Sequence, residues 1–321
     1  MQTTGVIGEF ISERGERFVG LAGLRDAIKP NWRSMLEPHR TSRPSIDRSK
    51  IEGQKNVVLN TEEFLGKHGF SLTGKRVLDV GCHTGIHSYL LAALGAAQVH
   101  GIDIPEYGIR QAVDMDVADD SRAFQSDLLG ELRREVSRYF SQEVVSRVTF
   151  DDISIEEMDL PDQFDAIVSW QTLEHIKNPE RAFKRMFRAL KRGGFCFHEY
   201  NPFFCYTGGH SLCTLDFLYG HCRLSGTDFK RYIKQFRPAE EKIAVEFYEH
   251  SLNRMSLADL NSYLRLAGFK ITSILPWISR DELKRFDEKV LRQVRANYPN
   301  VCDKDLLAPS VWVLIQKKCD T

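Results

Sequence analysis

Residues 77–85 read Val-Leu-Asp-Val-Gly-Cys-His-Thr-Gly, and no other stretch of the sequence is as informative. The apolar run that begins at Lys75 stops at Gly81, which indicates a short buried strand. Apolar residues from Ile86 to Leu94 then have helical spacing, which ends at Gly95. The glycines between strand and helix allow a ligand to approach the backbone closely. Because the first N–H groups of a helix have no partner within it, this turn is suited to an anionic group such as a carboxylate.

Strand patterns recur along the chain and alternate with helical ones. Further strands are predicted at Gln98–Ile102, Val148–Ile153, Phe164–Ser169, Phe195–Tyr200, Phe269–Pro276 and Ser310–Lys317, and helices at Pro179–Leu190, Ser256–Ala267 and Asp281–Asn297. This alternation is typical of parallel crossovers. We therefore expect an α/β fold with a Rossmann-like, doubly wound, mostly parallel seven-strand sheet whose last two strands form an antiparallel end.

Four regions follow from this pattern. Residues 1–70 form an N-terminal extension of helices and loops, with room for short helices in Gly5–Ile28. Residues 71–200 form the core, 201–255 an insertion after the fifth strand, and 256–321 the C-terminal helices and last two strands. The basic segment Pro30–Lys50 is interpreted as a solvated surface arm. The alternative is an arm that folds over the active site or contacts an anionic acceptor.

The composition argues against nucleic-acid-binding, membrane-spanning and secreted classes of protein. Lysine plus arginine and aspartate plus glutamate number 44 each, which argues against broad nucleic-acid binding through phosphate contacts. No apolar run reaches membrane-spanning length, and Glu9, Glu13 and Arg14 interrupt any signal-peptide core. The seven cysteines are scattered and odd in number, as expected for free thiols. We expect a cytoplasmic protein without a membrane segment.

An acidic residue, Asp103, ends the second strand and could accept both ribose hydroxyls of a nucleoside ligand. One competing class is the NAD-dependent dehydrogenases, whose pyrophosphate favours Gly-x-Gly-x-x-Gly after the first strand. Here Asp79 precedes the loop, His83 lies inside it and the second glycine is missing. A carboxylate at that point suits an ammonium group better than a pyrophosphate, so the dehydrogenase is disfavoured.

With this ordered set of segments the chain resembles the class I S-adenosylmethionine-dependent methyltransferases. The matching segments are 77–85, Gly101-Ile102-Asp103, Phe164–Ser169, Leu173-Glu174-His175, Leu190–Gly194 and Ala267-Gly268-Phe269. The resemblance extends from about Leu72 to Phe269. The order of the segments makes it specific, because each of them alone is common.

The resemblance implies S-adenosyl-L-methionine as cofactor and a role for each matching position. The cofactor-binding residues it implies are Asp79, Gly81, Cys82, His83 and Gly85 in the loop, Asp103 and Ile104 at the ribose and adenine, Ser154 and Ile155 beside the adenine, and Trp170 and Gln171 facing the methionine end and the acceptor. The sequence departs from the family at two positions. His83 stands where relatives often have glycine, and Ser154 where an aspartate often binds the adenine amino group.

Methyl transfer to a hydroxyl requires a base, and histidine is the usual one near neutral pH. His210 and His221 are the preferred candidates, because they lie in the segment Tyr206–Arg223 after the fifth strand, which we expect to wall the acceptor. The alternative is that the aromatic residues of this segment fill a small core. His175 is the third candidate, although its ring could simply brace a helix start.

No metal site is predicted. Cys205, His210, Cys213, His221 and Cys222 lack the short paired spacing of zinc ligands. The favoured function is a methyltransferase acting on an oxygen or nitrogen of a small organic acceptor. The alternatives are an RNA-modifying methyltransferase that uses the basic arm and a non-catalytic nucleotide-binding module.

Overall fold

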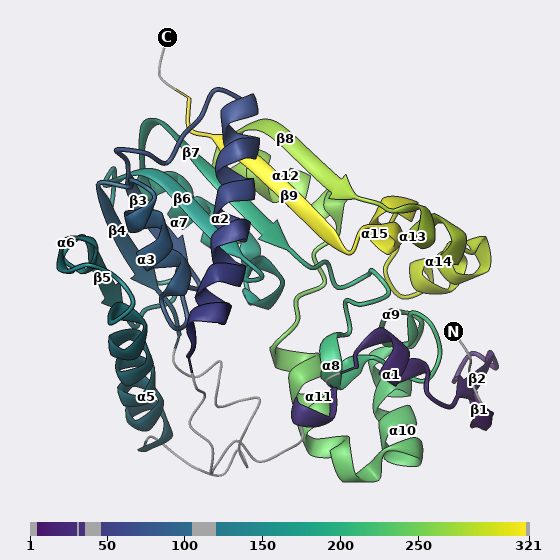
Figure 1. Ribbon diagram of the computed structural model, residues 1–321. Coiled ribbons are helices and arrows are strands. Elements are labelled where there is room, and N and C mark those ends of the chain that lie inside the picture. Colours follow the sequence, from purple (N-terminus) through teal and green to yellow (C-terminus); the bar gives the residue numbers. More distant parts are fainter. Residues whose placement is uncertain (1–4, 31, 36–45, 105–119, 319–321) are drawn as a thin grey trace.

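The computed structural model describes residues 5–30, 32–35, 46–104 and 120–318 (Figure 1). Its centre is a sheet of seven strands in the order β5-β4-β3-β6-β7-β9-β8. The strands are β3 Arg76–Val80, β4 Gln98–Ile102, β5 Val148–Asp151, β6 Phe164–Trp170, β7 Leu190–Tyr200, β8 Lys270–Trp277 and β9 Ser310–Gln316. Neighbours from β5 to β7 pair in parallel, whereas β9 runs antiparallel to both β7 and β8. The predicted Rossmann-like, mostly parallel seven-strand fold is therefore confirmed.

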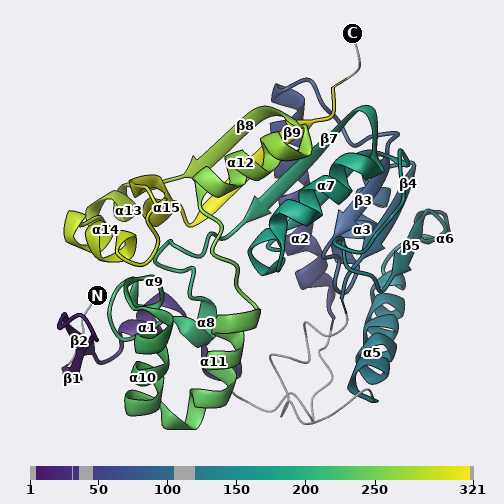
Figure 2. The same ribbon diagram turned by 180° about the vertical axis from the view of Figure 1, so that it is seen from behind.

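Helices cover both faces of the sheet (Figures 1 and 2). Helices α2 (Arg48–Lys67), α3 (Ile86–Ala93) and α5 (Asp120–Ser137) share a core with one face. Helices α7 (Pro179–Ala189) and α12 (Leu257–Ala267) share a second core with the other face. The short helix α6 (Gln142–Val145) precedes β5.

The ends of the helices on the second face are encoded locally. Asn178 caps α7, with proline as its first residue. Ser256 caps α12 in a reciprocal capping box with Asp259, and Gly268 ends the helix at a φ of 96°. These are the signals that made α7 and α12 predictable.

A third core lies in a separate body, which we call the helical lobe (residues 203–252 with 6–28 and 286–306). Its middle segment forms α8 His210–Cys213, α9 Gly220–Arg223, α10 Gly226–Phe236, the 3-10 turn η3 Pro238–Glu240 and α11 Glu241–His250. Its C-terminal segment carries α14 Glu288–Arg295 and α15 Asp303–Leu307, and α13 Arg280–Arg285 precedes that segment. Figure 2 shows the lobe beyond the ends of β7 and β9.

The N-terminal extension divides between these two bodies. Strands β1 (Val6–Ile11) and β2 (Arg17–Leu21) form an antiparallel hairpin, and α1 (Leu24–Ile28) and η1 (Trp32–Met35) follow. Arg25 is 3% exposed and forms an ion pair of 2.8 Å with Glu240, which ties α1 to the lobe. Helix α2 packs on the sheet instead.

Three predicted details were wrong. Residues 5–28 form mainly a hairpin rather than short helices, because Phe10 and Phe18 are buried by the lobe, a contact that local sequence does not reveal. The twenty-residue helix α2 was missed. The helix predicted at 281–297 is two helices, α13 and α14, separated at Phe286 and Asp287. Most of the predicted arm Pro30–Lys50 lies outside the described residues.

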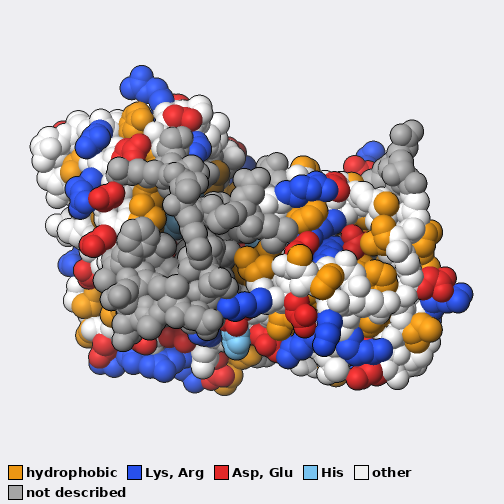
Figure 3. Space-filling view, turned by 90° about the horizontal axis from the view of Figure 1, so that it is seen from below, with side chains coloured by type: hydrophobic (Ala, Val, Ile, Leu, Met, Phe, Trp, Pro, Cys, Tyr) orange, Lys and Arg blue, Asp and Glu red, His pale blue; other side chains and the backbone are white. Residues whose placement is uncertain are grey.

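The surface carries both signs of charge. Figure 3 shows basic and acidic side chains side by side over the face that it presents. Within the described part of the chain, no helix is both long and apolar enough to cross a membrane.

Candidate functional site

The loop after β3 has the open geometry that its glycines allow. Gly81 and Gly85 both have a φ of 78°, and His83 between them has a φ of 43°. The N–H groups of Gly81 and Cys82 donate to the carbonyl oxygen of Ile102 at 2.8 and 3.1 Å, which holds the loop against the end of β4. No side chain caps the N-terminus of α3. The first N–H groups of this helix therefore remain available to an anionic ligand.

Only glycine fits at two of these positions. A Cβ at Gly81 would lie 2.2 Å from Oγ1 of Thr172, and one at Gly85 would lie 2.5 Å from the ring of Phe150. His83 adopts the left-handed conformation that glycine adopts most readily. This conformation explains why the resemblance leads one to expect a glycine, rather than His83, at this position. The side chain of His83 is exposed.

Asp79 lies below the loop and is almost completely buried, with 1% exposure. Its Oδ2 accepts a hydrogen bond of 2.6 Å from the hydroxyl of Ser88 in α3. Burial, assisted by the negative charge of Asp103, raises the pKa of Asp79 to about 7. The carboxyl group therefore changes charge near neutral pH and would be held ionised by a positive group bound close to it.

Asp103 follows the end of β4 and is fixed by the backbone. Its Oδ2 accepts from the N–H of His83 at 2.6 Å, and its Oδ1 accepts from the N–H of Ile104 at 2.7 Å. A carboxylate has about four acceptor positions, so both oxygens can accept further hydrogen bonds. The side chain is thus preoriented beside the loop for a ligand with hydroxyl groups.

Arg133, on α5, was not predicted from the sequence, yet it joins two sides of the site. Its Nε donates to the carbonyl oxygen of His83 at 3.0 Å, and its Nη1 forms an ion pair of 3.0 Å with Asp152 after β5. The guanidinium group lies over the ring of Phe150, 4.7 Å from its centroid. No signal marked this residue, because no helix was predicted where α5 lies.

Two residues predicted to contact the cofactor have their side chains in packed cores. The side chain of Ile155 is 4% exposed and belongs to the core on the α7 face, so it is not available beside a ligand. Trp170 is 6% exposed, and its indole N–H donates to Thr61 of α2 at 3.2 Å. The ring of Trp170 therefore faces α2 rather than an acceptor. Ser154 lies in the turn after β5, where its hydroxyl accepts from the N–H of Glu156 at 3.2 Å.

Of the residues after β6, Gln171 is held by β7 and Thr172 approaches the loop with its side chain. Gln171 is exposed and has a φ of 52°, and its N–H donates to the carbonyl oxygen of Glu199 at 2.8 Å. Thr172, which the sequence reasoning missed, is the residue that packs against Gly81. Its Oγ1 donates to the carbonyl oxygen of Trp170 at 3.0 Å. The sequence carries no signal for Thr172, because its contact with Gly81 exists only in the folded structure.

His221 lies inside the core of the helical lobe. It is 1% exposed, and its Nε2 bonds to the carbonyl oxygen of Phe203 at 2.7 Å. Burial lowers its pKa to about 4. This placement contradicts the prediction that His221 is a base at the acceptor. Phe203, Phe204, Phe217 and Tyr219 belong to the same core, so the aromatic residues of this segment fill a core.

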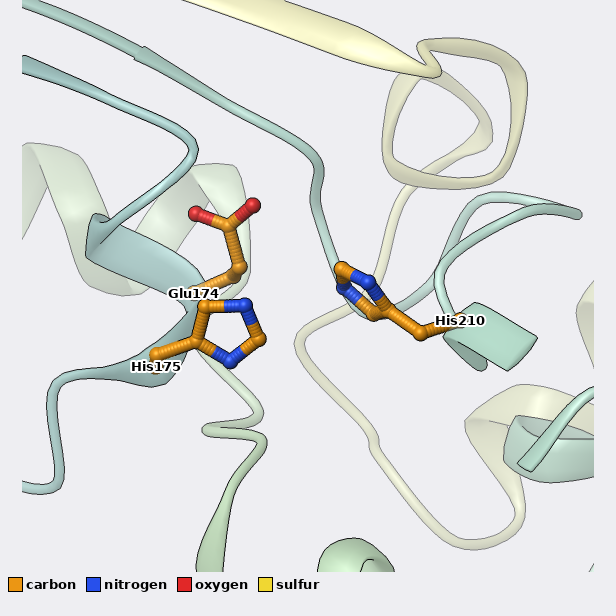
Figure 4. Close-up of side chains that lie close together, drawn as sticks. All are labelled: Glu174, His175 and His210. Atoms are coloured by element: carbon orange, nitrogen blue, oxygen red, sulfur yellow. The ribbon is translucent and has the colours of Figure 1, made fainter. Parts of the chain in front are cut away.

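His175 and His210, by contrast, come together where the sheet meets the lobe (Figure 4). His175 ends the 3-10 turn η2 (Leu173–His175) after β6, and His210 begins α8 after β7. Their ring centroids are 5.0 Å apart. Burial lowers the pKa of His175 to about 4 and that of His210 well below its usual value. Both imidazoles are therefore neutral at pH 7 and retain a lone pair.

Glu174 completes this group. It is 1% exposed, and burial raises its pKa to about 8. One ligand atom each from Glu174, His175 and His210 lies within 4.8 Å of the others. Among the described residues, this is the group whose atoms could hold a metal ion. It is not the set of cysteines and histidines between Cys205 and Cys222 whose spacing argued against a zinc site. Cys205, Cys213 and Cys222 are free and buried.

Comparisons with known proteins indicate the family of this chain. The model of a family described as a methyltransferase domain matches residues 54–274. The ubiquinone biosynthesis O-methyltransferase of Dechloromonas aromatica (strain RCB) is 33% identical over 129 residues, which are 40% of this chain and 44% of that protein. The protein of the same name from Pseudomonas fluorescens (strain Pf0-1) is 27% identical over 237 residues, which are 71% and 78% of the two chains.

These alignments are partial. The chain spans less than half the length of the first relatives that it matches. Among solved structures, the phosphoethanolamine N-methyltransferase 2 of Haemonchus contortus in complex with S-adenosyl-L-methionine aligns with 83% of this chain and 53% of that chain. The two are 19% identical, with a TM-score of 0.47.

Proposed function

We propose that this chain, which belongs to the methyltransferase domain family, transfers a methyl group from S-adenosyl-L-methionine to an oxygen or nitrogen of a small organic acceptor. The observation that carries the proposal is the open glycine loop 81–85 at the end of β3, beside the preoriented carboxylate of Asp103. Relatives named as O-methyltransferases support a small acceptor. The interspersed surface charges give no separate support to an RNA acceptor.

Each part of the cofactor has a suitable partner in the loop region. Asp103 would accept hydrogen bonds from the ribose hydroxyls, as carboxylates after the second strand do in dinucleotide sites. The uncapped N-terminus of α3 would receive the carboxylate of the methionine moiety. The ammonium group would favour the ionised form of Asp79, whose pKa is raised to about 7 without a ligand. Gly81 and Gly85 would allow the ligand to approach the backbone closely.

The acceptor would bind where the sheet meets the helical lobe, near His175 and His210. S-adenosyl-L-methionine would supply its methyl group to the acceptor oxygen or nitrogen, with S-adenosylhomocysteine as the leaving group. The enzyme mainly holds the nucleophile and the methyl group in line. The acceptor proton would pass to a neutral imidazole, for which His210 and His175 are the candidates and His221 is not.

The test combines binding with turnover. S-adenosylhomocysteine should bind in a calorimetric titration, and a panel of phenols, catechols and amines should contain an acceptor whose methylated product is seen by mass spectrometry. His210→Gln should slow turnover, while the matched variant His221→Gln should affect mainly stability. Tight binding of NADH with no response to S-adenosylhomocysteine would overturn the proposal. Cofactor binding without any methylated product across the panel would favour a non-catalytic module.

A further inference from the structure

Polar atoms without a partner gather where the carboxyl ends of β6 and β7 meet the helical lobe. In the described part of the chain, buried side-chain atoms that lack a hydrogen bond include Oε2 of Glu174, the hydroxyl of Tyr200, Oδ1 of Asn201 and Nε2 of His210. Glu174 and Asn201 are in contact, since the N–H of Asn201 donates to Oε1 of Glu174 at 3.1 Å. Buried polar groups are almost always bonded to protein, water or an ion. Several unsatisfied ones at one junction therefore require a further partner there, either water or an ion.

From this we infer that Glu174, His175 and His210 form a site for a first-row divalent transition metal ion. Each residue offers one ligand atom within 4.8 Å of the others. Figure 4 shows Glu174 and His175 projecting from the same turn and His210 approaching from the opposite side. The three ligands thus come from both bodies of the protein, η2 at the sheet and α8 in the lobe.

The ligands are oriented by the hydrogen bonds that metal sites usually show. Nδ1 of His175 donates to the carbonyl oxygen of Ser251 at 2.6 Å, so the lone pair of the neutral ring lies on Nε2. The amide of Asn253 donates to the carbonyl oxygens of Leu173 and Ile176 at 2.6 and 3.0 Å, which holds the turn that carries Glu174 and His175. The bond from Asn201 fixes the carboxylate of Glu174 and leaves Oε2 toward the ion.

The donor set selects the class of ion. Two imidazoles and one carboxylate suit Zn²⁺ and its first-row neighbours, whereas Mg²⁺ and Ca²⁺ prefer oxygen ligands. At a tetrahedral Zn²⁺, with bonds of about 2.0–2.1 Å, neighbouring ligand atoms lie roughly 3.4 Å apart. Because the ligand atoms lie within 4.8 Å of one another, the side chains would move together by up to about 1.4 Å when the ion binds. His210 holds a φ of 50°, a strained conformation of the kind found at ligand sites.

The ammonium group of Lys29 competes with a metal ion for the negative charge of Glu174. It is partly buried, which lowers its pKa, and it interacts with the charges of Cys205 and Glu174. A divalent ion in direct contact with the carboxylate carries twice the charge of the ammonium group. Replacing Lys29 by methionine should therefore tighten metal binding, because the repulsion between the two cations is removed.

The role of the ion in methyl transfer, though not its binding, rests on the function proposed above. Three protein ligands leave a coordination position open, as in catalytic zinc sites. The hydroxyl oxygen of an acceptor could occupy that position, where the ion would lower the pKa of the hydroxyl. With the ion bound, His175 and His210 would be ligands rather than bases, and the hydroxyl proton would pass to solvent.

The experiment measures metal binding on the full chain, without cofactor or acceptor. Protein freed of metal with a chelator is titrated with Zn²⁺ and with Co²⁺, and its thermal unfolding is recorded with and without Zn²⁺. We expect one ion per chain, a rise in Tm and visible Co²⁺ absorption bands. Glu174→Gln and His210→Gln should weaken Zn²⁺ binding by about 100-fold or more, given that even outer-shell changes weaken it by 10–100-fold. Lys29→Met should strengthen it.

His221→Gln is the matched control, because it changes a buried histidine of the same lobe outside the ligand set. It should keep the Zn²⁺-dependent rise in Tm even where the starting Tm is lower. Wild-type protein that takes up no stoichiometric ion would overturn the inference. So would binding that persists in Glu174→Gln and His210→Gln but is lost in Cys205→Ala. A titration with S-adenosylhomocysteine on the same samples tests the methyltransferase proposal separately.

Discussion

Asparagine in place of Asp79 should stabilise the protein at neutral pH when no cofactor is bound. Burial raises the pKa of this carboxyl from 3.8 to about 7 in the folded state. A raised folded pKa adds stability that is fully present below pH 4 and is lost as the pH rises through 7. The difference of about three pKa units corresponds to roughly 4 kcal/mol. Asparagine does not titrate and can still accept the hydrogen bond from Ser88, so it avoids this loss.

The free energy of unfolding of both proteins should be measured with urea at pH 5 and pH 8. The advantage of Asp79→Asn over the wild type should grow by a few kcal/mol between the two values. The control Asp159→Asn removes an exposed carboxylate with surface ion pairs, which typically contribute about 0–1 kcal/mol. A difference between Asp79→Asn and the wild type that is the same at both pH values would refute the reasoning. S-adenosylhomocysteine should reduce the difference at pH 8, because its ammonium group favours the ionised carboxylate.

Three further predictions test the site. Asp103→Ala should weaken S-adenosylhomocysteine binding by about tenfold or more in a calorimetric titration, since charge-assisted hydrogen bonds contribute about 1.5–3 kcal/mol; unchanged affinity would remove Asp103 from the site. Gly81→Ala should also weaken that binding at least about tenfold, because its Cβ would meet Thr172 at 2.2 Å and its φ of 78° disfavours a side chain. Adding Thr172→Ala should restore part of the affinity, and failure to do so would assign the loss to the backbone alone. His221→Ala should lower Tm without changing cofactor affinity, whereas His210→Ala should slow turnover by about 10²–10⁴-fold; equal slowing in both would reinstate His221 as a base.

The elements that could be predicted are those whose signals are local. Buried strands such as β3 and β4 have short apolar runs that end at the loop or at an acidic residue, and the limits of β4 were predicted correctly. The helix α12 carries a cap at Ser256 and a stop at Gly268, both visible in the sequence. The glycine loop and Asp103 also follow one another within a short stretch. Local physics therefore sufficed for the sheet and for locating the glycine loop and Asp103 at its edge.

The elements that were missed depend on distant contacts. Helix α2 interleaves polar and apolar residues and contains Gly53, so it has no strong apolar stripe. His210 and His221 both follow glycines in the same segment, and their positions in the sequence do not reveal which one is enclosed by a core. Glu174 and His175 lie far from His210 along the chain and meet it only because β7 leads directly into the helical lobe.

The position of β9 has a consequence for the order in which the protein can fold. Although it follows every other strand in the sequence, β9 lies in the interior of the sheet, between β7 and β8. During synthesis, the edges of β7 and β8 stay unpaired until residue 316 has left the ribosome. Unpaired strand edges are sites where chains aggregate. Until β9 emerges, the nascent chain therefore exposes two strand edges at which it can aggregate, and a chain released before β9 is made would have a gap in its sheet.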